Sequence, residues 1–173
     1  ITLMRLDDAL REGRSIYATI LATAVNNDGR RKVGYAAPSV DGPLAGIEEA
    51  LAVAGVEPRA IGYVEAHGTG TPFGDSIEVH ALTQAFRRQT DEVGFCVLGA
   101  NKPNLGHTDA ASGVISLIKA ACSLRAGELA PLANFRTPHP LLELESSPFR
   151  VNTKLTPWPR DGEPRHALVN CLA

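Results

Sequence analysis

The stretch "YVEAHGTGTPFGD" (63–75) holds the residues of this sequence whose types and spacing are best suited to chemistry. It leads from an apolar segment into His67, which can exchange a proton near neutral pH. Thr69 and Thr71 follow, each after a glycine, and their hydroxyls can donate and accept hydrogen bonds. Glycines allow backbone conformations closed to other residues and let a ligand come close. We therefore predict that this stretch forms the floor of a site.

A second stretch, "NKPNLGH" (101–107), also follows an apolar segment and ends in a histidine. His107 stands before an expected helix, whose positive end disfavours imidazolium, so we expect it to stay neutral and to act as a base or a hydrogen-bond donor. Lys102 can supply fixed positive charge. Loops after parallel strands meet at one edge of a sheet, so His67 and His107 should converge if their strands are neighbours.

Each of these residues also has an ordinary structural interpretation. His67 could be a satisfied strand-end histidine, and Lys102 an exposed loop lysine. For Asp75 we favour a structural role near the start of a helix over catalysis. Three further histidines, His80, His139 and His166, are expected to be solvated.

Metal, phosphate and thiol chemistry have less support. A zinc site would compete for the histidines, but HxH, HExxH and CxxC spacings are absent, so no metal site is predicted. "HGTGTPFGD" matches neither a P-loop nor a dinucleotide fingerprint. Cys96, Cys122 and Cys171 lie in apolar runs, and none follows a strand into a tight turn before a helix, where a thiolate would be activated. We predict that all three are core residues.

Composition indicates a globular chain with one sizeable core, since 44% of its 173 residues are hydrophobic and 21% are charged. A net charge of −2 gives no reason to expect a nucleic acid or an anionic membrane as partner. The cysteine spacing suits a reducing, cytoplasmic location better than a disulfide framework. The first residues lack the apolar centre of a signal peptide. Because both ends fall inside apolar segments, we expect the chain to be a piece of a longer protein.

The elements that must position the histidines alternate between strands and helices. Strands are predicted at 15–25, 60–67 and 94–100, with turn chemistry at 26–31. Helices are predicted at 41–56, from Asp75, and from a cap at Thr108 or Asp109 to about Arg125. Two final strands, at 149–158 and 166–173, are predicted to form a hairpin. This alternation predicts an α/β layered architecture with a mostly parallel sheet.

The third predicted helix has a single polar stripe formed by Ser112, Ser116, Lys119 and Ser123. Nearly everything else on it is apolar or small. A helix that is apolar around most of its circumference belongs in the middle of a structure, so we predict that this helix is buried.

At this point the two histidine stretches can be compared with a known family. "VEAHGTGTPFGDSIEVHAL" and "NKPNLGHTDAASGVISLIKA" resemble the two histidine motifs of β-ketoacyl synthases, most closely those of polyketide synthase ketosynthase domains. The flanking "AVNNDGRRKVGYAAPSVDGP" and "PLANFRTPHPLLELESSPFRVNTKLTPWP" resemble the same family. The resemblance implies a thiolase-like fold of αβαβα layers. Residues 1–173 would be the C-terminal half of one ketosynthase domain, with the nucleophilic cysteine on an absent N-terminal half and the last glycine-rich loop also absent.

The resemblance implies a decarboxylative Claisen condensation between an acyl chain on that cysteine and a malonyl-type extender. The extender would arrive on the phosphopantetheine arm of an acyl carrier protein, and the chain itself would bind no cofactor. His67 and His107 would donate hydrogen bonds to the thioester carbonyl, His67 would also assist decarboxylation, and Lys102 would orient both. Thr69 and Thr71 would contact the arm. The implied partners are the carrier protein, the N-terminal half and a second copy in a homodimer.

The sequence departs from the family pattern near its end. Leu172 and Ala173 stand where the family has a phenylalanine that gates the cysteine and a glycine, so Leu172 is the predicted gating position. Pro103 replaces a small polar residue and would stiffen its loop. The alternatives are a non-catalytic partner of the chain-length-factor type, a decarboxylase-only homologue, and, more remotely, a thiolase-fold enzyme acting on coenzyme A thioesters. Without the other half to cover its buried helix, the chain is expected to be unstable alone.

Overall fold

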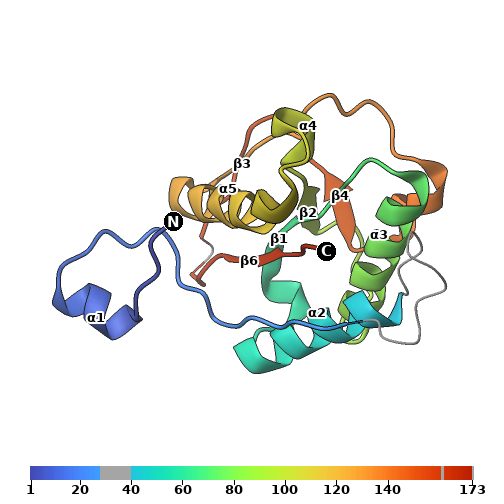
Figure 1. Cartoon of the computed structure of the whole chain (residues 1–173). Coiled ribbons are helices and arrows are strands. Elements are labelled where there is room, and N and C mark those ends of the chain that lie inside the picture. Colours follow the sequence, from blue (N-terminus) through green and yellow to red (C-terminus); the bar gives the residue numbers. More distant parts are fainter. Residues whose placement is uncertain (28–39, 161, 173) are drawn as a thin grey trace.

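A four-stranded parallel sheet forms the centre of the chain (Figure 1). The computed structural model describes residues 1–27, 40–160 and 162–172. The strands are β1 (Ile61–Glu65), β2 (Cys96–Gly99), β4 (Phe149–Val151) and β6 (His166–Val169), in the order β4-β2-β1-β6. The predicted α/β class with a mostly parallel sheet is confirmed.

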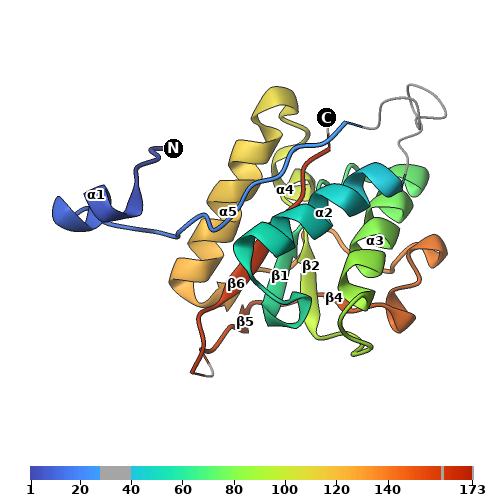
Figure 2. The ribbon, with the colours of Figure 1, turned by 90° about the horizontal axis from the view of Figure 1, so that it is seen from below.

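Helices cover both faces of this sheet (Figures 1 and 2). The helices α2 (Asp41–Ala54) and α3 (Pro72–Arg87) lie on one side, and α5 (Ser112–Ala126) lies on the other. Side chains alternate along a strand, so Val64 packs with the α2–α3 side while its neighbour Tyr63 packs with α5. The sheet is therefore a middle layer, which explains why its two central strands are almost wholly buried.

The two helices of the first layer follow their sequence signals. Gly55 ends α2 in the left-handed conformation, with φ +61°, as predicted from the glycine there. The helix α3 begins at Pro72, three residues before the predicted start, and Asp75 lies in its first turn. Its buried side chains include Leu82 and Phe86, both 0% exposed. A short 3₁₀ turn, Pro58–Ala60, connects α2 to β1.

The predicted hairpin at the end of the chain is wrong. The strands β4 and β6 lie at opposite edges of the sheet, where each pairs in parallel with a central strand. Thr156–Pro157 forms a separate strand, β5, antiparallel to β3 (Glu128–Leu129). Asn152 redirects the chain between β4 and β5, because its Nδ2 donates to the carbonyl of Leu129 at 2.8 Å. The two apolar runs thus join opposite edges of one sheet, and the end of the first run pairs in a second sheet.

The strand predicted at 15–25 is also absent. This segment forms no helix or strand and pairs with no strand among the described residues, and apolar side chains such as Tyr17, Leu21 and Val25 are exposed. The Arg125 guanidinium lies 4.1 Å from the ring centroid of Tyr17. The preceding helix α1 (Leu6–Arg11) stands apart from the body in both views. A strand needs a neighbouring strand to pair with its backbone N–H and C=O groups, and this segment has none among the described residues. The predicted turn at 26–31 lies mostly outside the described residues.

The helix α5, predicted to be buried, is buried on one side only in the described part of the chain. Its polar stripe faces the sheet, with Ser112 and Ser116 each 1% exposed, whereas Val114 and Ile118 are more than 40% exposed. No side chain caps the helix, and a 3₁₀ turn (Asp109–Ala111) precedes it. Serine side chains are small and hydrogen-bonded here, so the stripe fits against the sheet.

Two of the three cysteines are not core residues. Cys96 is buried in β2, but Cys122 and Cys171 are exposed. Cys122 lies four residues after Ile118 and shares the exposed apolar face of α5, while Cys171 follows β6. Short elements complete the fold: α4 (Lys102–Leu105), η4 (Pro140–Leu142) and η5 (Leu144–Ser146). In the described part of the chain, every helix is too short or too polar to cross a membrane.

Candidate active site

The pairing of β1 with β2 brings the two histidine loops together. The strands are parallel with Glu65 opposite Gly99, so the loops that follow leave from the same edge of the sheet. The rings of His67 and His107 lie 5.5 Å apart between centroids, with their planes at 79°. The predicted convergence of the two histidines is confirmed.

Lys102 sets the electrostatics around His67. Its side chain is almost buried, and its ammonium donates to the carbonyl of His67 and lies 3.3 Å from Nδ1 of the same residue. Burial, the Lys102 charge and the neighbouring His107, in that order, lower the pKa of His67 to about 4. His67 is therefore neutral at physiological pH, and Lys102 is not the exposed loop lysine of the ordinary interpretation.

His107 is oriented by the turn that starts α5. Its Nδ1 accepts a hydrogen bond from the backbone N–H of Asp109 at 3.0 Å and lies 3.4 Å from the hydroxyl of Ser112. Asp109 adopts φ +50°, which lets its amide face back toward the ring.

The two imidazoles share one pattern of donors. In each ring Nδ1 faces a donor, the ammonium of Lys102 or the amide of Asp109, so a neutral ring carries its proton on Nε2. Neither Nε2 has a hydrogen-bond partner within the described ranges. The site thus presents two N–H donors from adjacent rings, an arrangement suited to stabilising negative charge on one carbonyl oxygen.

A buried carboxylate that the sequence analysis missed fixes the backbone at His67. Glu78 of α3 is 2% exposed, and it accepts from the N–H groups of His67 and Gly68 at 2.7 and 3.0 Å. Asn170, after β6, also donates to it at 2.6 Å. Burial raises the pKa of Glu78, while these donors act in the opposite direction. The first loop is therefore held by a helix and by the end of an edge strand.

The glycine–threonine pairs line the exposed side of this loop. Gly68 has φ +50°, and a Cβ there would come within 2.8 Å of the Cβ of Ala100. The hydroxyls of Thr69 and Thr71 lie 3.1 Å apart and are exposed. Asp75 accepts from the N–H of Gly70 at 3.1 Å, and burial raises the pKa of Asp75 against its hydrogen bonds. Asp75 thus has the structural role that the sequence favoured.

The predicted gating position lies next to the site. Leu172 is half-buried and follows Cys171, whose Sγ is 3.7 Å from Nδ1 of His67. The other histidines lie elsewhere: His80 and His139 are exposed, as predicted, whereas His166 is half-buried at the start of β6.

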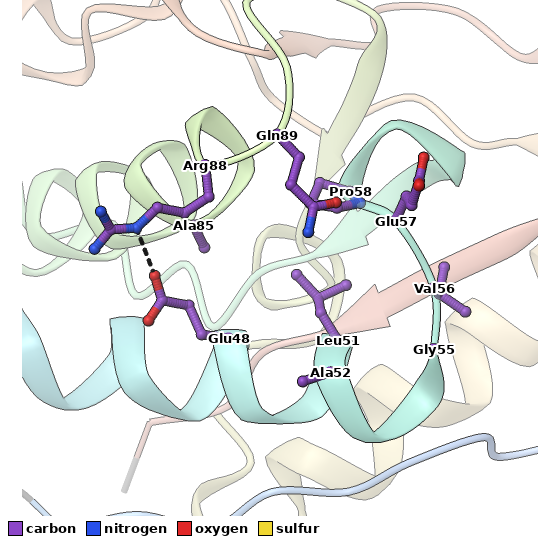
Figure 3. Close-up of a pocket in the computed structure, with 10 residues that line it drawn as sticks. All are labelled: Glu48, Leu51, Ala52, Gly55, Val56, Glu57, Pro58, Ala85, Arg88 and Gln89. Carbon is purple, nitrogen blue, oxygen red and sulfur yellow. Dashed lines mark hydrogen bonds and ion pairs between the residues drawn. The ribbon is translucent and has the colours of Figure 1, made fainter.

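A cavity lies away from the histidines. It measures about 420 Å³ and opens between the carboxyl-terminal turns of α2 and α3 (Figure 3). Pro58, just before β1, lines it, so it lies at the amino edge of the sheet. Glu48 and Arg88 form an ion pair across its rim at 2.9 Å. Among the described residues, no three potential ligand side chains are grouped so that they could hold a metal ion.

Comparison with known proteins identifies the family. Residues 17–136, about two thirds of the chain, match the model of the β-ketoacyl synthase C-terminal domain. The chain is 44% identical over 151 residues to the polyketide synthase PksN of Bacillus subtilis (strain 168), covering 87% of this chain and 3% of the relative. It is 44% identical over 172 residues to a mycocerosic acid synthase-like polyketide synthase of Mycolicibacterium smegmatis, covering 98% of this chain and 8% of the relative.

Solved structures agree with this assignment. Ketosynthase twelve of the bacillaene polyketide synthase of Bacillus amyloliquefaciens superposes with a TM-score of 0.92 at 41% identity, covering 95% of this chain and 29% of that one. The module 6 ketosynthase of the bacillaene synthase of Bacillus subtilis 168 gives 0.91 at 42% identity, covering 95% and 30%. The chain belongs to the β-ketoacyl synthase family and has the thiolase-like fold of its ketosynthase domains. It spans only a small part of these relatives.

Proposed function

We propose that this chain supplies the extender side of a ketosynthase active site in polyketide biosynthesis. The observation that carries the proposal is the pair of Nε2 donors on His67 and His107, held by Lys102 and by the backbone of Asp109. An acyl chain on a cysteine of an N-terminal half would be extended by a malonyl-type unit carried on the phosphopantetheine arm of an acyl carrier protein.

The two donors act on the negative charge that this reaction creates. Loss of carbon dioxide from the malonyl unit leaves an electron pair that is delocalised onto the thioester carbonyl oxygen. His67 and His107 donate to that oxygen, and each such donor typically contributes ~10²–10³ in rate. The enolate carbon then attacks the acyl thioester, and the cysteine thiolate leaves. Lys102 acts on His67 as a positioning group, because its ammonium faces Nδ1 and favours the tautomer with the proton on Nε2.

The exposed loop suits an extended thioester arm. Thr69 and Thr71 present hydroxyls next to glycines with positive φ, so the phosphopantetheine arm can lie against the backbone and accept or donate hydrogen bonds. Leu172 follows Cys171, whose Sγ is 3.7 Å from Nδ1 of His67, and would contact the acyl chain at the gate.

The exposed face of α5 supports an N-terminal half as partner. Val114, Ile118 and Cys122 lie on one face of this helix and are exposed. The apolar side chains of the unpaired segment 15–25 are exposed as well. Both surfaces would be covered in a complete domain, meaning this chain together with an N-terminal ketosynthase half. The homodimer stays an expectation from the family resemblance.

The test uses the complete domain in its parent protein, with a malonyl-loaded carrier protein and an acyl thioester. His67→Ala and His107→Ala are compared with His80→Ala, which changes an exposed histidine of α3. Mass spectrometry follows acylation, decarboxylation and extension separately. We expect wild type and His80→Ala to extend the acyl chain, and both site variants to acylate but lose extension by at least a hundredfold. A wild type that only decarboxylates, or never acylates, would favour the decarboxylase or non-catalytic alternative.

A further inference from the structure

A second buried carboxylate lies between the elements of the site without touching the reacting groups. Glu65, the last residue of β1, is 0% exposed. It accepts from the hydroxyl of Tyr63, from Nδ2 of Asn101 at 2.9 Å, and from the ammonium of Lys119 at 2.9 Å. Burying a carboxylate is costly unless it is paired and hydrogen-bonded. The partners of Glu65 therefore show which segments of the chain this carboxylate connects.

Each partner of Glu65 lies in or next to an element that adjoins a site residue. Glu65 ends β1, two residues before His67. Asn101 immediately precedes Lys102, and Lys119 lies on α5, the helix that follows His107. One carboxylate therefore connects the segments that carry the two histidines and the lysine.

The orientation of Asn101 depends on the Glu65 charge. Its amide nitrogen donates to Glu65 and to Oγ of Ser116 at 2.7 Å, whereas its buried Oδ1 has no hydrogen-bond partner among the described residues. A reversed amide would place Oδ1 against the carboxylate, and two acceptors repel. The side chain is therefore held only by the acceptors that its two hydrogens face.

This orientation extends to Lys102 through the backbone. The carbonyl of Asn101 accepts from the N–H groups of Asn104 and Leu105 at 2.9 and 3.2 Å, which closes the turn of α4. Lys102 is the first residue of that turn, and its ammonium reaches His67. A shift of Asn101 would therefore move the lysine that orients the first histidine.

We propose that Glu65 and Lys119 are positioning residues that hold the two histidine loops in register for the extension step. The carboxylate orients Asn101 and thereby Lys102, and the ammonium of Lys119 pairs with that carboxylate and ties α5 to β1. Neither residue touches the substrate. The inference rests on the proposed function, because its activity readout is acyl-chain extension.

The main test removes the buried pair without leaving a lone charge. Glu65→Gln/Lys119→Met is made in the complete domain, and Glu48→Gln/Arg88→Met, which removes the ion pair at the opposite edge of the sheet, is the matched control. We expect the double variant to acylate within twofold of wild type and to extend at least tenfold more slowly, with the KM for the malonyl carrier protein within twofold. The control should match wild type in all three. Extension by the double variant at the wild-type rate would overturn the proposal.

A milder variant serves if the double variant does not fold. Ser116→Ala removes one acceptor of Asn101 and leaves the pair of Glu65 and Lys119 intact. We expect extension to slow about threefold with acylation unchanged, and Lys119→Arg, which keeps the charge, to extend at the wild-type rate. An unchanged extension rate in Ser116→Ala would then contradict the positioning role.

A third readout does not need turnover. The charged and titratable groups that face His67 are Lys102, His107, Cys171 and the Glu78 carboxylate behind its backbone N–H. If Glu65 and Lys119 position Lys102, then removing this pair should raise the pH midpoint for protonation of His67, measured by nuclear magnetic resonance. The Glu48→Gln/Arg88→Met control should leave that midpoint unchanged. An unchanged midpoint in the double variant would contradict the positioning role, whatever the extension rate. Failure of wild type to extend the acyl chain would refute the proposed function instead.

Discussion

Replacing Lys102 by methionine tests the electrostatic account of the site directly. The ammonium lies 3.3 Å from Nδ1 of His67 and disfavours a second positive charge there. Methionine keeps the length and the apolar stem of the side chain but removes the charge. We expect the pKa of His67 to rise from about 4 toward its ordinary value of 6.5 and to stop well short of it.

The size of this rise is bounded by the order of the causes. Burial, the Lys102 charge and His107 all lower the pKa of His67, and burial is the largest of them. Removing the second cause can therefore restore less than half of the interval between about 4 and 6.5. One pH unit corresponds to about 1.4 kcal/mol, so the ammonium adds less than about 1.7 kcal/mol to the cost of protonating His67, and solvent at the open side of the ring lowers that figure.

The assay is a pH titration of the His67 ring by nuclear magnetic resonance in the complete domain. The resonance is assigned from its loss in His67→Ala, and Lys154→Met, which removes an exposed lysine distant in sequence, is the control. The His67 ring of wild type should titrate near pH 4. In Lys102→Met it should titrate above that value but in the lower half of the interval from about 4 to 6.5. A midpoint unchanged or lowered by Lys102→Met would refute the reasoning, as would a return to the full value of 6.5.

Four further outcomes follow from the same contacts. Because the folded pKa of His67 is about 4 and its ordinary value is 6.5, the unfolded chain binds the extra proton between these values; the stability of the complete domain should fall as pH drops through this window, and His67→Ala should lack that fall in urea unfolding. Glu78→Ala leaves the donors of the first loop unpaired and should cost ~3–5 kcal/mol, with Glu78→Gln costing less by the same measurement. Phe149→Ala removes a buried ring whose centroid is 5.0 Å from that of Phe86 and should cost ~3–5 kcal/mol in thermal unfolding. Gly68→Ala should slow extension at least tenfold while acylation continues, because φ +50° and a 2.8 Å approach would displace the loop; a wild-type rate would contradict this.

The sequence predicted the part of the site that depends on strand adjacency. His67 and His107 each follow an apolar run and a strand, and parallel strands in alternating α/β chains bring such loops to one edge. The family resemblance added the role of Lys102, which its loop position alone left open. Glu78 was missed, although a carboxylate on the same helical face as Ala81 and Leu82 is a visible signal for a buried, partnered acid.

The wrong strand predictions share one physical origin, which is the choice of pairing partner. The segments 15–25, 149–158 and 166–173 all have strand-like composition, and composition does not say which edge a strand joins. The sheet places β4 and β6 at opposite edges, and the first segment has no partner among the described residues. A predicted hairpin equates neighbours in sequence with neighbours in space, which holds for tight turns but fails where an irregular connection intervenes.

The orientation of α5 links its packing to the chemistry. Ser112 faces His107 and Ser116 faces Asn101, so the polar stripe is the side of α5 that faces the site. An apolar stripe there would bury the helix equally well but would give the His107 ring and the Asn101 amide no partner. The apolar remainder of the helix must then face outward, where Val114 and Ile118 are exposed. An N-terminal half that packs against that face would stabilise the helix that orients His107. The same packing would therefore complete the hydrophobic core and fix the geometry of the site.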